Sequence, residues 1–124
     1  MSFLVAQAYL KLIRFEFCLK PSNFSTLCEN VHNYPLSTQV SSPRDVIRIC
    51  SAVDVACIWY WKQVLCLQRS AATACLLRRH GAKAQMVLAA RPMPFRAHAW
   101  VEVEGRVVND KSDVQETYAV LARC

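Results

Sequence analysis

The chain has 124 residues, of which 54% are hydrophobic and only two are glycine, so a single folded domain spanning residues 1–124 is expected. No apolar run reaches the roughly 18–20 residues that span a bilayer, and no basic region or small-residue cleavage site marks a signal peptide. The net charge is +6, but Lys and Arg are scattered. We therefore expect no transmembrane segment and no nucleic-acid partner, while the positive charge suits an acidic peptide.

Seven cysteines, an odd number without an export signal, favour free thiols in a reducing, cytoplasmic compartment. None forms a C-x-x-C pair, and the nine-residue spacing of Cys57, Cys66 and Cys75 does not gather three ligands on one helix. We therefore expect no metal and no cofactor. Most of these cysteines are expected to be small buried hydrophobic residues.

Residues 1–42 are predicted to be a helical region with polar loops. Apolar residues at three- and four-residue spacing predict a first helix that ends near residue 20, before Pro21; they are Phe3, Ala6, Leu10, Ile13 and Phe17. This helix is expected to pack on the core, with attachment to a membrane surface as the alternative. Polar loops around one short helix are predicted for residues 21–42.

Residues 43–124 are predicted to form a core of helices and a sheet. Its first helix begins with Ser42 as a cap, Pro43 in the first turn and Asp45 near the positive end of the dipole. The buried stripe of this helix is predicted to be Val46, Ile49, Val53, Ala56 and Tyr60, with Cys50 and Cys57 beside it.

A second helix is predicted to begin at Cys66 and to end at His80, with Gly81 just beyond the end. Its small residues, Ala71, Ala72 and Ala74, allow close packing against a sheet. Residues 82–90, 97–103 and 106–110 are predicted strands of a meander, and prolines break the connection at residues 91–95. This order of elements predicts an α+β fold with a helical N-terminal part and a small antiparallel sheet.

Cys66 differs from the other cysteines because it lies at a predicted helix start, where unpaired N–H groups and the dipole stabilise a thiolate. Val64 and Leu65 before it are poor caps, so those N–H groups can face a reacting carbonyl.

The hairpin after residue 97 decides whether His98 can meet Asp110. A two-residue turn at residues 104–105 would point the two side chains to opposite faces, and it needs positive φ at Glu104 as well as Gly105. A three-residue turn at residues 103–105 puts the positive φ on Gly105 alone and places His98 opposite Asp110. Their Cβ atoms would then be about 4.5–5.5 Å apart. Turn chemistry therefore favours the three-residue turn.

A thiolate, an imidazole and a carboxylate in this relation form a catalytic triad: the thiolate attacks a carbonyl, the imidazole moves the proton, and the carboxylate fixes its tautomer. His32 and His80 have no equivalent carboxylate on a strand, and Asp113 is less well placed than Asp110.

The stretch CLQRSAATACLLRRHGAKAQMVLAA, followed by FRAHAWVEVEGRVVND, resembles the protein B leader peptidases of lasso-peptide biosynthesis, which have a transglutaminase-like, papain-related cysteine fold. The likeness covers residues 66–110 and depends on CL-x-RS, LLRR-x-G and HAWVE together. It implies that Cys66 is the nucleophile, His98 the general base and acid, and Asp110 the orienting carboxylate. Gln68 departs from the smaller residue or proline that the family pattern leads us to expect.

The resemblance implies a bacterial cytoplasmic cysteine protease that removes the leader from a ribosomally made precursor peptide. A separate ATP-dependent lasso cyclase would then join the new N-terminus to an acidic side chain. The sixty-five residues before Cys66 are predicted to be helical, without a strand-rich recognition module. We therefore expect a stand-alone peptidase of the split type, helped by a separate leader-recognition protein.

Two alternatives use the same sequence features. A transglutaminase-like acyl transferase has the same triad, and a non-catalytic scaffold could present the peptide to the cyclase, although a scaffold has no need of Cys66, His98 and Asp110. Gln63 is a candidate oxyanion donor or a plain exposed glutamine. Trp100 shields the site from water or simply packs.

Overall fold

The computed structural model describes residues 2–18, 24–37, 42–61, 63–92, 94–111 and 114–124. Its elements, in chain order, are α1 (Ser2–Cys18), α2 (Phe24–His32), α3 (Pro43–Trp59), α4 (Cys66–Arg79), β1 (Ala84–Arg91), β2 (Arg96–Val103), β3 (Arg106–Val107), α5 (Val114–Thr117) and β4 (Ala119–Arg123). The strands form an antiparallel sheet in the order β3-β2-β1-β4. Helices packed on an antiparallel sheet confirm the predicted α+β class.

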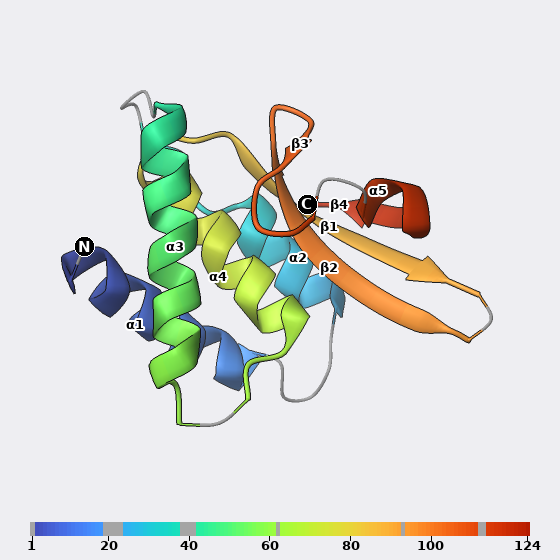
Figure 1. The fold of residues 1–124 in the computed structure, drawn as a ribbon, viewed down its shortest axis with the longest axis horizontal. Coiled ribbons are helices and arrows are strands. Elements are labelled where there is room, and N and C mark those ends of the chain that lie inside the picture. The colour runs from blue at the N-terminus through green and yellow to red at the C-terminus, as the bar shows by residue number, and fades with distance from the viewer. Residues whose placement is uncertain (1, 19–23, 38–41, 62, 93, 112–113) are drawn as a thin grey trace.

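Helix α4 is the centre of the fold, because it contacts α1 and α3 as well as β1 and β2 (Figure 1). Its residues Ala71, Ala72 and Ala74 are fully buried. Alanine side chains allow the helix backbone to approach the neighbouring elements closely, as predicted. The β1–β2 hairpin extends beyond the helices, so its far end is free of helical cover (Figure 1).

The two faces of the sheet have different neighbours, because successive side chains of a strand point to opposite faces. Met86 and Val101 join the main core with α4. Val87, Ala89 and Trp100 form a second, smaller cluster with Val114 of α5, and Val107 and Tyr118 pack against it. By this alternation His98 belongs to the face of Trp100, opposite to the face that α4 covers.

The predicted start of α3 and the predicted C-terminal end of α4 are confirmed. Ser42 and Asp45 form a reciprocal capping box at the start of α3, with each side chain bonded to the other residue's backbone N–H at 3.2 Å. His80 is the C-cap of α4, and Gly81 follows with a φ of 92°, a conformation that glycine adopts without strain.

The predicted apolar stripe of α1 is wrong for most of its described members, although Ile13 is half-buried and packs against the core. The side chain of Phe17 lies outside the described residues. Phe3 and Leu10 are 72% and 66% exposed, whereas the residues in the core are Ala8, Leu12 and Phe15. Both sets are apolar with helical spacing, so periodicity alone could not choose between them. The choice is made by packing against α3 and α4.

The predicted three-residue turn is also wrong. Val103 pairs with Arg106, so residues 104–105 form a two-residue turn, with φ values of 53° at Glu104 and 81° at Gly105. Glu104 therefore adopts the left-handed conformation, which the sequence analysis treated as unfavourable for this residue. Strand β3 is much shorter than the predicted 106–110, and α5 and β4 were not predicted.

A disulfide joins Cys28 of α2 to Cys124 beside β4, so the prediction of free thiols is wrong for these two cysteines. The pair links residues 96 positions apart in the chain. Backbone hydrogen bonds of 2.8 Å in both directions between Met86 and Cys124 also hold this end of the chain against β1. Within the described ranges, no helix has the length and apolar character needed to cross a membrane.

Candidate active site

Cys66 is the first residue of α4, as predicted, and its side chain is exposed. Leu65 is the N-cap and makes no capping hydrogen bond through its side chain. The first N–H groups of a helix lack acceptors within the helix, so those at the start of α4 can bind a carbonyl oxygen. The positive end of the helix dipole lies at the same place. This is the environment in which reactive cysteines are commonly found.

Gln68, the departure from the family pattern, fixes the first turn of α4 from inside the protein. Its side chain is 2% exposed, and its Nε2 donates to the carbonyl of Leu12 in α1 at 2.8 Å and lies 3.5 Å from the hydroxyl of Tyr60. Sequence reasoning missed this role because nothing local distinguishes a buried glutamine from an exposed one. The contact joins the helix that carries Cys66 to α1 and to the end of α3.

The other described thiols outside the disulfide lie in less reactive environments. Cys50 and Cys75 are buried, and Cys57 is half-buried. Burial raises the pKa of Cys50 to about 11, with the charge of Asp54 adding to the effect. Burial also raises the pKa of Cys57. Cys66 is the exposed member of this set, which supports its selection over the others.

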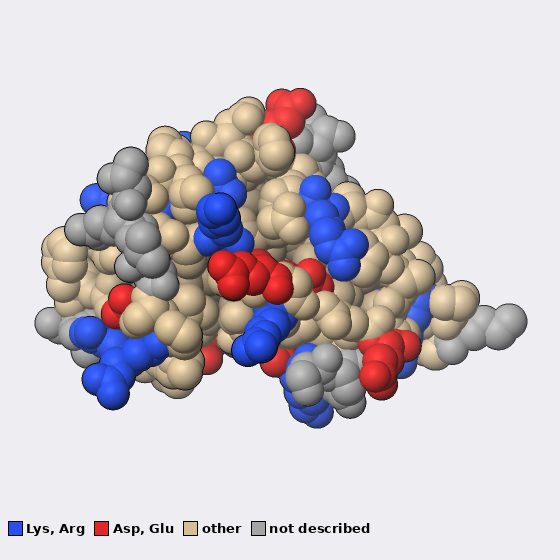
Figure 2. Space-filling model, turned by 90° about the horizontal axis from the view of Figure 1, so that it is seen from above, with Lys and Arg blue, Asp and Glu red and all other residues tan. Residues whose placement is uncertain are grey.

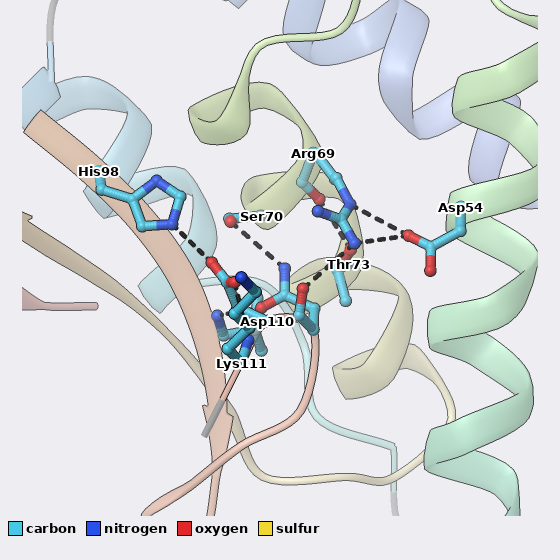
Figure 3. A network of polar contacts seen from close by, with 9 residues as sticks. Asp54, Arg69, Ser70, Thr73, His98, Asp110 and Lys111 are labelled. Atoms are coloured by element: carbon cyan, nitrogen blue, oxygen red, sulfur yellow. Dashed lines mark hydrogen bonds and ion pairs between the residues drawn. The ribbon is translucent and has the colours of Figure 1, made fainter. Parts of the chain in front are cut away.

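His98 and Asp110 are brought together as predicted (Figure 3). His98 Nε2 lies 2.5 Å from Asp110 Oδ2, and both side chains are about a quarter exposed. The other carboxylate oxygen accepts the backbone N–H of Lys111 at 2.8 Å. A carboxylate can only accept, so the Nε2 proton belongs to this hydrogen bond. In the neutral ring, Nδ1 is then left as the acceptor that can take a proton from a nucleophile.

Asp110 reaches His98 by a different route from the predicted cross-strand pairing. The ladder continues past β3 only as far as the hydrogen bond from Val108 N to the carbonyl of Val101, at 3.0 Å. The side-chain Oδ1 of Asn109 then accepts from Val101 N at 2.7 Å, in place of a backbone acceptor. The chain bends at this point, and Asp110 approaches the imidazole from beyond the strand. The predicted contact is therefore present although the turn argument behind it is wrong.

Asn109 is the residue of the site that sequence reasoning missed. Besides binding Val101, its Nδ2 lies 3.4 Å from Ser70 Oγ, and its carbonyl accepts from Arg69 at 3.1 Å (Figure 3). Arg69 in turn forms an ion pair with Asp54 of α3 at 2.6 Å. These contacts attach the segment before Asp110 to the first turns of α4. The adjacent asparagine and aspartate after a strand were the available signal.

Aromatic rings surround the imidazole on its own face of the sheet. The ring centroid of His98 lies 6.0 Å from that of Trp100 and 5.3 Å from that of Tyr118. Trp100 is fully buried, which favours the packing alternative of the two predicted for it. Tyr118, between α5 and β4, was not predicted because neither element was.

Glu102 is a buried carboxylate that holds Trp100 in place. The indole Nε1 donates to Glu102 Oε2 at 2.9 Å, and Gln115 Nε2 donates to the same oxygen at 2.7 Å. Arg123 Nε lies 3.5 Å from the other carboxylate oxygen, Oε1. Burial acts to raise the pKa of this carboxyl, but the two hydrogen bonds and the charge of Arg123 outweigh it and lower the pKa. Glu102 therefore has a structural role on the face of the sheet that carries His98.

The other candidates named from the sequence are Gln63, His32, His80 and Asp113. Gln63 is exposed, and His32 is exposed at the end of α2; His80 Nε2 lies 3.1 Å from Gln7 Oε1. Asp113 falls outside the described residues. Within the ranges described, no group of three or more His, Cys, Asp or Glu is arranged to hold a metal ion, and the Cys66 thiol makes no hydrogen bond to the His98–Asp110 pair.

Comparison with known proteins gives a family and one distant relative. The profile described as the transglutaminase-like superfamily matches residues 9–123. The microcin J25-processing protein McjB of Escherichia coli is 37% identical over 57 residues, which are 46% of this chain and 27% of that protein. The chain therefore covers only about a quarter of that relative's length. No solved structure matches.

Proposed function

The chain belongs to the transglutaminase-like superfamily, and we propose that it is a cysteine peptidase that removes the leader from a ribosomally made precursor of a lasso peptide. The observation that carries this proposal is the contact between His98 Nε2 and Asp110, which leaves Nδ1 as a proton acceptor. The uncapped helix start at Cys66 supplies the matching nucleophile and N–H groups. The similarity to a microcin-processing protein supports a peptide precursor as the substrate.

In this mechanism His98 Nδ1 takes the proton of Cys66, and the thiolate sulfur attacks the carbonyl carbon of the scissile bond. The backbone N–H of Cys66 stabilises the negative oxygen of the intermediate. The C–N bond then breaks, and the imidazolium returns its proton to the departing amine. Water, deprotonated by His98, next attacks the thioester carbon; the C–S bond breaks, the imidazolium returns its proton to the Cys66 sulfur, and the peptide acid leaves.

One spacing and one contact support the placement of Cys66 near His98. Ser70 lies four residues after Cys66, and residues at this spacing share one face of a helix. Asn109, directly before Asp110, contacts Ser70. The face of α4 that carries Cys66 is therefore attached to the segment that carries Asp110. This segment follows β3 in the chain. The proposed site would therefore lie where the start of α4 approaches the segment after β3.

The proposed reaction belongs to a pathway with further proteins. We propose a cytoplasmic reaction in a bacterium, followed by an ATP-dependent cyclase that uses the new N-terminus. The described residues before Cys66 form helices and no strand, so we also propose that a separate leader-recognition protein raises the local concentration of the cleavage site. These parts of the proposal depend on the family resemblance.

The test is cleavage of a precursor peptide, followed by mass spectrometry, with and without a leader-binding protein from the same gene neighbourhood. We expect one cut at the leader–core junction, faster with the leader-binding protein, and no cut with Cys66→Ala. Cys57→Ala, which removes a half-buried thiol outside the proposed site, is the matched control and should retain activity.

The same assay separates the alternatives. An acyl transferase would join an added primary amine to the peptide instead of hydrolysing it, giving a product of a different mass. A scaffold would bind the precursor without changing it, and Cys66→Ala would then behave like the wild type. Either result would overturn the peptidase proposal.

A further inference from the structure

Two arginines face each other at the free end of the β1–β2 hairpin. Arg91, the last residue of β1, is paired in register with Arg96, the first residue of β2. Like charges directly opposite each other on a sheet destabilise the pair. Among the described residues neither arginine has an ion-pair partner; the ion pairs found there involve Arg69, His98 and Arg123. The hairpin therefore holds two close positive charges without a counter-charge.

Arg91 is restrained, although its charge is not neutralised. Its Cζ lies 5.7 Å from the ring centroid of Tyr118, a distance within reach of a cation–π interaction. Its Nε is buried and has no hydrogen-bond partner within the described part of the chain. Buried donors of this kind are nearly always bonded in folded proteins. The charge of Arg91 is therefore not matched by a hydrogen-bond acceptor from the described residues.

The two arginines lie on the same face of the sheet as the imidazole. Arg96 and His98 are two positions apart on β2, so their side chains share one face, with a rise of roughly 6.6–6.8 Å between them. Tyr118 connects the two places physically, because its ring contacts both His98 and Arg91. Ala89 pairs with His98 on the neighbouring strand β1. Its side chain is small, so the ring of Tyr118 can extend over it.

Positive charge elsewhere does not form a competing basic surface on the face seen in Figure 2, where Lys and Arg side chains lie apart and acidic side chains lie among them. Recognition of an anion on this face would therefore depend on local pairs of cations. Guanidinium groups suit a carboxylate because their planar N–H donors match its two oxygens.

We infer that Arg91 and Arg96 bind the carboxylate of an acidic side chain of the substrate peptide, within about two residues of the bond that Cys66 cleaves. The distance follows from the extended substrate, which rises about 3.3 Å per residue, like the strand beside it. This inference rests on the proposed peptidase function and adds the substrate class: peptides with Asp or Glu next to the cleavage site.

The test uses precursor peptides in which each Asp or Glu within three residues of the junction is replaced by its amide, one at a time. One amide substitution is expected to raise KM about 10- to 100-fold, the range for loss of a hydrogen-bonded charged group, with a smaller change in kcat. Arg96→Gln and Arg91→Gln should abolish this preference for the acid over the amide. Arg106→Gln, an exposed arginine on β3, is the matched control and should keep it.

Two further arms complete the experiment. Peptides with an amidated C-terminus distinguish an acidic side chain from a terminal carboxylate, since only the latter would lose binding. Arg91→Glu should reverse the preference towards a peptide with Lys at the sensitive position. Arg96 is exposed, so Arg96→Gln remains informative even if variants of Arg91 fail to fold.

Binding measured with Cys66→Ala, by fluorescence anisotropy of labelled peptides, separates this inference from the proposed function. Preferential binding of the acidic peptide that depends on both arginines would support the carboxylate site even if no variant cleaves. Equal binding of acid and amide peptides, or no binding of either, would overturn it even if cleavage is confirmed.

Discussion

The two halves of the proposed site are held in different ways. On the nucleophile side, Cys66 begins a helix whose next turns are buried against α1, α3 and the sheet, with Gln68 bonded inside the core. On the imidazole side, Asp110 follows a very short strand and is positioned by polar contacts of Asn109. The helix side depends on packing, whereas the strand side depends on a few hydrogen bonds. Substitutions on the two sides should therefore have different consequences.

The largest effect on the strand side is expected from Asp110→Asn. The amide can donate to His98 Nε2 and so favours the tautomer with the proton on Nδ1, which cannot then accept the proton of the thiol. Turnover should fall by about 10²–10⁴-fold, with the circular dichroism spectrum unchanged. The measurement is kcat for precursor cleavage, together with a thermal unfolding curve.

Asp113→Asn removes the neighbouring carboxylate and is the matched control. It should leave turnover within about threefold of the wild type, because Asp110 is the carboxylate bonded to the imidazole. If Asp113→Asn lowered turnover and Asp110→Asn did not, Asp113 and not Asp110 would be the orienting carboxylate.

On the helix side, the comparison of thiols predicts which cysteine reacts first. With a pKa of about 11, Cys50 is a thiolate in only about one molecule in 10⁴ at pH 7, and the pKa of Cys57 is also raised. Exposed Cys66 should therefore react with iodoacetamide fastest, by roughly 10²-fold or more. Peptide mapping by mass spectrometry at short times measures this order.

Raising the pH towards 11 should narrow the difference, because the fraction of Cys50 in the thiolate form increases as the pH approaches its pKa. Labelling in denaturant provides the control in which all these thiols react. Faster alkylation of Cys57 or Cys75 than of Cys66 in the folded protein would contradict the assignment of the nucleophile.

The same contrast explains how much could be predicted from the sequence. The start of α4, its alanine face and the cap at Ser42 could be predicted, because helix ends and helix faces depend on residues within a few positions of one another. The face of α1 could not, since two apolar stripes satisfy the same period and packing chose between them. The Cys28–Cys124 disulfide joins distant residues and has no local signal.

The site was predicted unevenly for a similar reason. His98 and Asp110 do meet, but the predicted turn was wrong, since Glu104 accepts a positive φ. Asp110 is brought to the imidazole by Asn109, whose side-chain oxygen accepts from the backbone N–H of Val101 in place of a backbone carbonyl. Such a contact depends on the bend after β3 and on Ser70 of α4, neither of which follows from strand alternation.

Asn109→Ala is expected to have an intermediate effect that combines stability and activity. The change leaves the buried backbone N–H of Val101 without its acceptor, which costs about 1–3 kcal/mol of unfolding free energy. It also loosens the segment before Asp110, and misplacement of a catalytic group by about 1 Å can cost up to about 10²-fold in rate. Urea unfolding and kcat of the same preparation measure both effects.

Ser70→Ala removes only the longer of the two side-chain contacts, at 3.4 Å, and serves as the graded control for Asn109→Ala. Ser70→Ala should lower both the unfolding free energy and kcat, but by less than Asn109→Ala. A variant of Asn109 that loses stability but keeps full kcat would show that the loop does not position Asp110.

The smallest effect on catalysis is expected from Gln68→Leu, although this glutamine is only two residues from Cys66. Leucine fills a similar buried volume but cannot donate to the carbonyl of Leu12, so the unfolding free energy should fall by about 1–2 kcal/mol. The kcat per folded molecule should stay within about twofold, because the glutamine points into the core and away from the exposed thiol. Gln85→Leu, at an exposed position of β1, is the matched control and should change stability by less than about 0.5 kcal/mol. Denaturant unfolding gives the stability, and titration of the reactive thiol gives the number of folded sites against which kcat is expressed. A large loss of kcat with unchanged stability would show instead that Gln68 acts on the reaction, and the nucleophile side would then depend on polar contacts as much as the strand side does.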